Sequence, residues 1–436
     1  MTGSRSSEIA GVHGRRIWDS RGRPTVEAEV ELRCGLSGRS IAPAGASTGS
    51  GEAVDRRDGP REAAAAFAGL DVTGAVGAVN GEISAALVGM DAADQAGIDA
   101  TLVKLDGTAD RSRLGGNAMI ATSMAVAHAA AAAGAVPLWR HLCGSENGAL
   151  PLPEIQIFGG GAHAGRRLDV QDFMCIAVGA ETFEQALDWT AEVYRAAGEL
   201  LADAGRLAGI ADEGGWWPSF DDNEEALHWL VRAIERAGLE PGEQMAVSLD
   251  IAASEFGSNG RYTLAREGRV LDTGEMIEKL EGWIARFPIV SIEDPLAEDD
   301  LEGLRAFTER VGHAVQVIGD DALVTNAKLV REAAAVGACN AVLVKPNQAG
   351  TLSETRAAFD AAAAADWGAV ISARSGESED VTVVHLAVGW GAKQLKVGSF
   401  ARSERMAKWN EGLRIAELLP RGGELPPRAS FPWGRR

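Results

Sequence analysis

The chain has 436 residues, enough for two domains, and 46% of them are hydrophobic. No apolar run approaches the ~20 residues of a membrane-spanning helix and no charged-then-apolar leader precedes the first predicted strand, so we expect a globular, cytoplasmic protein without membrane contacts. A formal charge of −20 disfavours nucleic acid and anionic lipid as partners.

The sequence also indicates how the chain is divided. Ala-rich stretches at 63–66, 129–133 and 361–365 predict helices, because alanine is the best helix former. The polar run SENGAL, from Ser145 to Leu150, indicates a boundary between domains at 1–145 and 146–436. The segment from Pro420 onward is rich in Pro, Gly and Arg and predicts an irregular surface tail. Four widely spaced cysteines match no zinc or disulfide pattern and predict reduced packing residues.

Four short apolar runs in the second half each end in charge: AVSLD at Asp250, IVSIED at Glu293, VQVIGDD at Asp320 and AVLVK at Lys345. Such runs are typical of buried parallel strands, and the segments between them have helical patterns, so the predicted fold is α/β, a (β/α) barrel. The C-terminal strand ends of a barrel converge on one mouth. Three carboxylates there need a divalent cation between them, and oxygen ligands favour Mg²⁺ or Mn²⁺.

Two later runs carry further polar groups to the same mouth. VISARS brings Arg374 and Ser375, and QLKVG brings Lys396. Together with Lys345 and a cation, these groups predict a pocket for a small, strongly anionic substrate.

Segments throughout the chain resemble the signature blocks of enolases. In the second half these are SIEDPLAEDD (291–300), GDDALVTN (319–326), VKPNQAGTLSE (344–354), SARSGESED (372–380) and ARSERMAKWN (401–410). In the first half they are DSRGRPTVE (19–27), APAGASTG (42–49), LGGNAMIATSMAVAHA (114–129), GGAHAG (160–165) and DEGGWWP (212–218). The resemblance runs from about Ile9 to about Leu419. It implies an enolase-type (β/α) barrel with an N-terminal α+β capping domain, assembled as a homodimer or as several dimers.

The resemblance also implies how a metal and a base are placed. Asp250, Glu293 and Asp320 match the ligands of a first Mg²⁺, and Ser47 lies on the mobile loop that contributes a ligand to a second. Mn²⁺ is the expected substitute. Lys345 matches the base that removes the proton next to the substrate carboxylate. A neutral Lys345 is expected, because Lys396 and the metal both disfavour a further positive charge.

Other residues match the groups that hold the substrate and protonate its leaving group. Lys396 matches the lysine that holds the substrate carboxylate, and Glu213 the acid that protonates the leaving hydroxide. Arg374 and Ser375 match the phosphate-binding pair, where Arg374 offers a bidentate fork. His163 matches a histidine that contacts the phosphate.

Several positions depart from the enolase pattern. The glutamate that supports the acid is here Asp172, which withdraws the carboxylate by ~1.5 Å. The histidine of the SHRSGE block is Ala373. The remaining departures are Ala44, Gly51, Gly159, Arg166, Arg167, Trp216 and Trp217.

These departures predict a wider and more basic pocket, in which Ala373 leaves space and Arg166 and Arg167 add charge. We therefore expect a substrate with an extended phosphoryl group. The hypothesis is dehydration of 2-phosphonoformylglycerate to carboxyphosphonoenolpyruvate, a step of phosphonate antibiotic biosynthesis of the phosphinothricin type. A glycolytic enolase acting on 2-phosphoglycerate is the first alternative. An inactive enolase fold with a binding role is the second, and the complete set of metal-binding and catalytic residues disfavours it.

Overall fold

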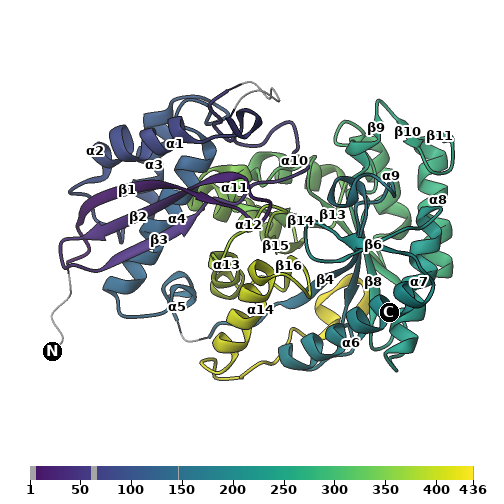
Figure 1. Cartoon of the computed structure of the whole chain (residues 1–436). Coiled ribbons are helices and arrows are strands. Elements are labelled where there is room, and N and C mark those ends of the chain that lie inside the picture. Colours follow the sequence, from purple (N-terminus) through teal and green to yellow (C-terminus); the bar gives the residue numbers. More distant parts are fainter. Residues whose placement is uncertain (1–5, 60–65, 146, 436) are drawn as a thin grey trace.

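The N-terminal part of the chain is an antiparallel sheet covered by helices (Figure 1), in a computed structural model that describes residues 6–59, 66–145 and 147–435. Helix α4 (Gly116–Ala133) packs closely on the sheet. A Cβ at Gly38 in β3 (Ser37–Ile41) would lie 2.1 Å from the backbone nitrogen of Ala129. The stretch 129–133 is helical, as predicted, and its small side chains let the helix approach the sheet. Of the stretch 63–66, residues 63–65 lie outside the described part.

The elements of this part follow in chain order. The strands are β1 (Ile9–Trp18), β2 (Pro24–Leu32) and β3 (Ser37–Ile41). The helices are η1 (Ala66–Gly69), α1 (Thr73–Ala78), η2 (Val79–Ile83), α2 (Ser84–Leu87), α3 (Gln95–Asp106), α4 (Gly116–Ala133) and α5 (Leu138–Cys143).

The second part is a closed barrel, as predicted from the sequence. Around the barrel the strands follow the order β16-β15-β14-β13-β12-β8-β5-β4, and β4 pairs with β16 to close it. The bounds are β4 (Leu152–Gly159), β5 (Asp172–Ile176), β8 (Ala246–Asp250), β12 (Ile289–Glu293), β13 (Gln316–Gly319), β14 (Ala341–Val344), β15 (Gly368–Ser372) and β16 (Gln394–Ser399).

One barrel strand runs against the others, which the sequence did not indicate. Strand β5 is antiparallel to both of its neighbours, β4 and β8. The connection from β4 to β5 contains only the short helix η3 (Gly161–Ala164), and a parallel connection would need a longer crossover. Because β5 is reversed, its first residue, Asp172, lies at the mouth beside Asp250, the last residue of β8.

Helices and short strands surround the barrel (Figure 1). Several helices begin at side-chain caps; at α8, for example, Asp272 and Glu275 form a capping box. The helices are α6 (Phe183–Asp203), α7 (Asn223–Arg236), η4 (Ala253–Glu255), α8 (Thr273–Arg286), α9 (Leu301–Val311), α10 (Ala327–Val336), α11 (Pro346–Ala349), α12 (Leu352–Ala364), α13 (Thr382–Trp390) and α14 (Ser403–Ala416). The accessory strands are β6 (Leu207–Ile210), β7 (Trp216–Pro218), β9 (Gly257–Ser258), β10 (Arg261–Leu264) and β11 (Arg269–Asp272).

The C-terminal tail is largely irregular and lies on the surface, as predicted, but three of its side chains, Leu425, Phe431 and Trp433, are buried. Leu425 donates a backbone hydrogen bond to Glu181, and Arg428 pairs with Glu243. The tail forms two short helices, η5 (Arg428–Ser430) and η6 (Pro432–Gly434). Phe431 and Trp433 stack at 4.6 Å, and both are buried. Aromatic burial anchors this segment despite its proline and glycine content.

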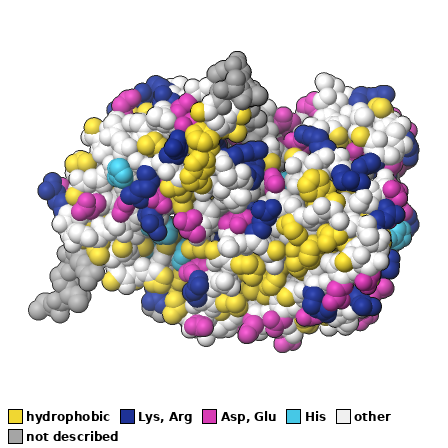
Figure 2. All heavy atoms as spheres, in the orientation of Figure 1, with side chains coloured by type: hydrophobic (Ala, Val, Ile, Leu, Met, Phe, Trp, Pro, Cys, Tyr) yellow, Lys and Arg dark blue, Asp and Glu magenta, His cyan; other side chains and the backbone are white. Residues whose placement is uncertain are grey.

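The face of the molecule shown in Figure 2 carries interspersed charges of both signs. Figure 2 shows basic and acidic side chains alternating over the visible face, with apolar side chains between them. Among the described residues, no helix has both the length and the apolar character needed to cross a bilayer.

Candidate active site

The predicted site residues, apart from Arg166 and Arg167, meet at one end of the barrel. Glu293 and Asp250 are neighbours in register across β12 and β8, and Asp320 directly follows β13. Lys345 follows β14, and Lys396 lies in β16 opposite Ser372 of β15. All these charged side chains are buried. A small cavity at this end is lined by Gly45, Ala46, Ser47, His163, Gln171, Asp172, Glu213, Asp250, Lys345, Ala373, Arg374, Ser375 and Lys396, among others.

The two lysines of the site are paired with the predicted metal ligands. Lys396 Nζ donates to Asp250 Oδ2 at 2.8 Å and to Glu293 Oε2 at 2.6 Å. Lys345 Nζ donates to Asp320 Oδ2. Burial lowers the pKa of Lys345, but the Asp320 and Glu293 carboxylates act together against burial and the pKa is raised. The contact with Asp320 favours the ammonium form of Lys345, whereas the neutral form expected from the sequence refers to a site that holds Mg²⁺.

The acidic groups of the site are suited to a hard divalent cation. Their donors are oxygens, and Glu293 Oε1 is buried without a hydrogen-bond partner. Within the described residues, two groups offer three ligand atoms within 4.8 Å of one another: Asp294 with Asp320 and Asp321, and His163 with Asp172 and Glu213. Asp250, Glu293 and Asp320 do not form such a group of three. In this structure their carboxylates pair with Lys345 and Lys396.

Asp294 and Asp321 are site residues that the sequence analysis missed. Asp294 accepts hydrogen bonds from the backbone N–H groups of Asp320, at 2.8 Å, and of Asp321, at 2.9 Å. Burial and the Asp320 carboxylate raise the pKa of Asp294 to about 8. Burial and Asp294 raise that of Asp321 to about 9. The doubled acids in IED and GDD were a visible signal, since each places a second carboxylate next to a predicted metal ligand.

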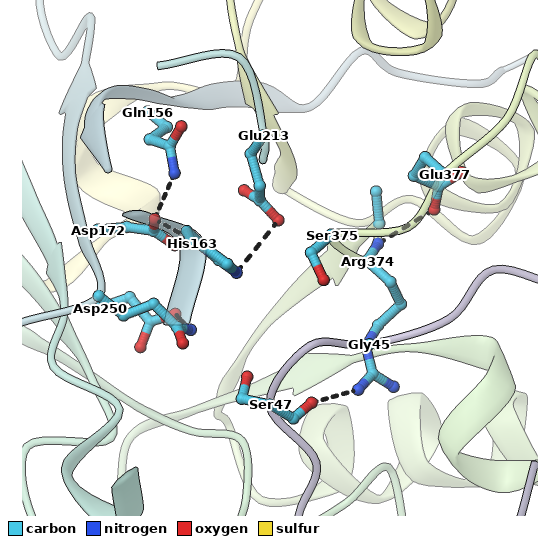
Figure 3. Close-up of polar contacts among 12 residues, drawn as sticks. Gly45, Ser47, Gln156, His163, Asp172, Glu213, Asp250, Arg374, Ser375 and Glu377 are labelled. Carbon is cyan, nitrogen blue, oxygen red and sulfur yellow. Dashed lines mark hydrogen bonds and ion pairs between the residues drawn. The ribbon is translucent and has the colours of Figure 1, made fainter. Parts of the chain in front are cut away.

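His163 lies between two carboxylates (Figure 3). Its Nδ1 is 2.8 Å from Asp172 Oδ1, and its Nε2 is 3.9 Å from Glu213 Oε1. Burial lowers the pKa of His163, but Asp172 and then Glu213 outweigh it and raise the pKa to about 9. Glu213 is on the connection between β6 and β7, so a connecting segment, and not a barrel strand, carries this carboxylate to the cavity.

Arg374 links the barrel to the N-terminal loop that carries Ser47. It donates to the Ser47 carbonyl at 2.8 Å and pairs with Glu52 at 2.9 Å. A Cβ at Gly45 would lie 1.9 Å from Arg374 Nη2, so only glycine permits this approach. Ser375 accepts a hydrogen bond from Arg21 at 3.2 Å. Arg21 and Glu52 were not predicted from the sequence, because neither follows a barrel strand.

The two arginines expected to enlarge the positive charge of the pocket point elsewhere in this structure. Arg166 pairs with Glu255 and its side chain is 63% exposed. Arg167 donates to Ser219 Oγ at 2.7 Å. Neither residue is among those that line the cavity.

Most of the other departures also create no free volume. A Cβ at Gly159 would lie 2.4 Å from the Cβ of Ala211, and one at Gly51 would lie 3.1 Å from Val324. Trp216 stacks on Tyr194 at 4.7 Å and is therefore a packing residue. The side chains of neighbouring residues thus fill the space that the sequence suggested was open at Gly159. Ala373 differs from these positions, because it lines the cavity.

Comparison with protein families agrees with this architecture. A family model described as "Enolase, N-terminal domain" matches residues 9–142. A second, "Enolase, C-terminal TIM barrel domain", matches residues 147–426. The two matches together cover nearly the whole chain.

Proposed function

Because the chain belongs to the enolase family, a family of lyases, we propose that it is a Mg²⁺-dependent hydro-lyase acting on a 2-phosphoglycerate-like substrate. The proposal rests on one observation: Lys345, Glu213, Lys396 and Arg374 line the same cavity as Asp250. A base, an acid, two cationic groups and a metal ligand are thus within reach of one small substrate. An inactive fold would have no physical requirement to keep all five together.

The proposed chemistry divides between the residues as follows. Lys345 accepts the proton next to the substrate carboxylate, which requires that its ammonium first separate from Asp320 and lose one proton to solvent, so that a neutral amine faces the substrate. Lys396 pairs with the substrate carboxylate. Glu213 protonates the leaving hydroxide. His163 and Asp172 orient Glu213 for this proton transfer. Bound Mg²⁺ supplies the positive charge that stabilises the second negative charge developing beside the carboxylate.

Two Mg²⁺ ions, with Mn²⁺ as a substitute, are proposed for each site. Asp250, Glu293 and Asp320 would hold the first, and Ser47 would contribute to the second. Exhaustive chelation should abolish turnover, and added Mg²⁺ should restore it. Turnover that survives chelation would contradict this part of the proposal.

For the substrate we propose 2-phosphonoformylglycerate, dehydrated to carboxyphosphonoenolpyruvate in phosphonate antibiotic biosynthesis. Ala373 supports this proposal, because a methyl group in the cavity wall leaves room beside Arg374 and Ser375. Asp172 supports it as well. Enolases bring a full-length glutamate to 2-phosphoglycerate at this position, and the shorter Asp172 carboxylate would reach that substrate less well. Arg166 and Arg167 would have to leave Glu255 and Ser219 to contact the added carboxylate.

A glycolytic enolase acting on 2-phosphoglycerate is the second candidate. The observation in its favour is that Arg166 and Arg167 point away from the cavity, while Ala211 fills the space at Gly159. The pocket is therefore less enlarged than its sequence suggests.

Assay of the purified protein with both substrates distinguishes the two candidates. Loss of one charge-assisted hydrogen bond costs ~1.5–3 kcal/mol, so we expect 2-phosphoglycerate to be turned over with kcat/KM at least ~tenfold below that of the extended substrate. Ala373→His should shift preference toward 2-phosphoglycerate, and Arg167→Ala should impair only the extended substrate. Efficient turnover of 2-phosphoglycerate by the unmodified protein would favour the glycolytic candidate.

We further propose an oligomeric state, a domain division and a cellular location for the protein. Family resemblance favours a homodimer or an assembly of dimers, divided into a capping domain at 1–145 and a catalytic domain at 146–436. Four free cysteines are compatible with action in the cytoplasm.

A further inference from the structure

A buried glutamine connects the Asp172 carboxylate to the segment that carries Glu213. Gln156 lies in β4, and its side chain is completely buried. Its Nε2 donates to Asp172 Oδ1 (Figure 3). Its Oε1 accepts from the backbone N–H of Gly215 at 2.9 Å. A backbone N–H only donates and a carboxylate only accepts, so a single orientation of the amide satisfies both contacts.

The contact with Gln156 determines which oxygen of Asp172 remains available. Asp172 Oδ1 receives hydrogen bonds from both Gln156 and His163. Asp172 Oδ2 is buried and has no partner. A buried acceptor without a partner costs free energy, and here it belongs to a residue that lines the cavity. The amide therefore holds one oxygen and leaves the other for a group that enters the cavity.

The same amide also fixes the segment that carries Glu213. Gly215, which donates to Gln156, is two residues after Glu213. A Cβ at Gly215 would lie 2.4 Å from Gln156 Oε1, so the segment can approach the amide only because this residue is glycine.

We propose that Gln156 is the positioning residue of this site, and that the length of its side chain is matched to the short carboxylate of Asp172. One side chain reaches from β4 and the other from β5, and together they span the distance between Gly215 and His163. Lengthening one should be tolerated only if the other is shortened. This inference rests on the proposed function for its kinetic consequences but not for its geometry.

A length-exchange cycle tests the match. Asp172→Glu and Gln156→Asn should each lower the rate of dehydration by ~ten- to hundredfold, because each breaks a charge-assisted contact in the cavity. The double variant, which restores the combined length, should recover to within a fewfold of the unmodified protein. Exchange of the α-proton with solvent, assigned to Lys345, should change much less in all three variants. Independent losses that multiply in the double variant would overturn the proposal.

A control separates positioning from a general effect on folding. Gln316 is another buried glutamine of the barrel; its Nε2 donates to Gln394 Oε1 at 2.6 Å, and it does not line the cavity. Gln316→Asn should lower the midpoint of thermal unfolding without changing the ratio of dehydration to exchange. A changed ratio in this variant would show that shortening any buried glutamine disturbs the site.

A readout that needs no turnover keeps the inference separate from the proposed function. In metal-free protein, the ring of His163 can be titrated by NMR. Each single variant should lower the pKa of His163, because the carboxylate at position 172 would no longer be held against Nδ1, and the double variant should restore it. If the unmodified protein dehydrates neither substrate while the titration follows this pattern, the proposed function fails and the positioning role stands. If the single variants leave the pKa of His163 unchanged, the positioning role fails.

Discussion

At the scale of single residues, the arrangement of Lys345 and Glu213 allows the two chemical steps to be separated. Lys345 follows β14 and lies against Asp320, whereas Glu213 is on the β6–β7 connection, near His163. Lys345→Ala should abolish exchange of the substrate α-proton with solvent. Glu213→Gln should retain exchange and lose at least ~100-fold in dehydration, the typical contribution of general acid catalysis. Measuring both rates by NMR in deuterated solvent checks this assignment, and equal losses of both rates in both variants would contradict it.

His163 should make stability depend on pH. Its pKa is raised to about 9 in the folded protein, against a reference value of about 6.5. A raised pKa means that the folded state binds the proton more tightly. The resulting stabilisation is fully present below pH ~6.5 and is lost as the pH rises through about 9. The free energy of unfolding of the unmodified protein minus that of His163→Gln, measured by urea denaturation, should therefore decrease between pH 6.5 and 9. A difference that is independent of pH would show that the imidazole is not charged in the folded state.

At the scale of elements, the sequence predicted the barrel strands whose last residues are charged. It did not predict the direction of β5 or the contacts of Gln156 in β4. Asp250, Glu293 and Asp320 were identifiable because each follows an apolar run of strand length. The direction of β5 was not identifiable, because periodicity carries no information on whether a strand runs parallel or antiparallel. Gln156 was passed over although it is a polar residue within the run PLPEIQI. Its partners, Asp172 and Gly215, are distant in the sequence, so no local pattern predicts their contact.

The C-terminal tail contains buried aromatic side chains that the sequence did not predict. Trp433 is 4% exposed and stacks on Phe431, so truncating it would leave a large cavity. Trp433→Ala should lower the free energy of unfolding by ~3–5 kcal/mol. Trp18 is 50% exposed, so Trp18→Ala serves as a control with a much smaller expected effect. Chemical denaturation of both variants measures the difference, and equal effects would show that the tail is not docked in solution.

At the scale of the whole molecule, the N-terminal part completes a site whose chemistry lies in the barrel. Ser47 and Glu52 belong to one loop of that part, and both contact Arg374 of the barrel. Burial lowers the pKa of Arg374, but Glu52 outweighs it and raises the pKa. The guanidinium therefore stays charged in a buried place because the loop supplies a carboxylate. A substrate phosphate would compete with that carboxylate for the same cation.

This competition leads to a prediction about Glu52. In Glu52→Ala, Arg374 would remain buried without its partner, and breaking a buried ion pair in this way costs ~3–5 kcal/mol. An anion can replace the lost carboxylate, so millimolar inorganic phosphate should raise the midpoint of thermal unfolding more in Glu52→Ala than in the unmodified protein. Glu298→Ala is the matched control: Glu298 accepts a hydrogen bond from the backbone of Ser50 on the same loop but forms no contact with Arg374. An identical response to phosphate in all three proteins would mean that Arg374 is not the group that receives the anion.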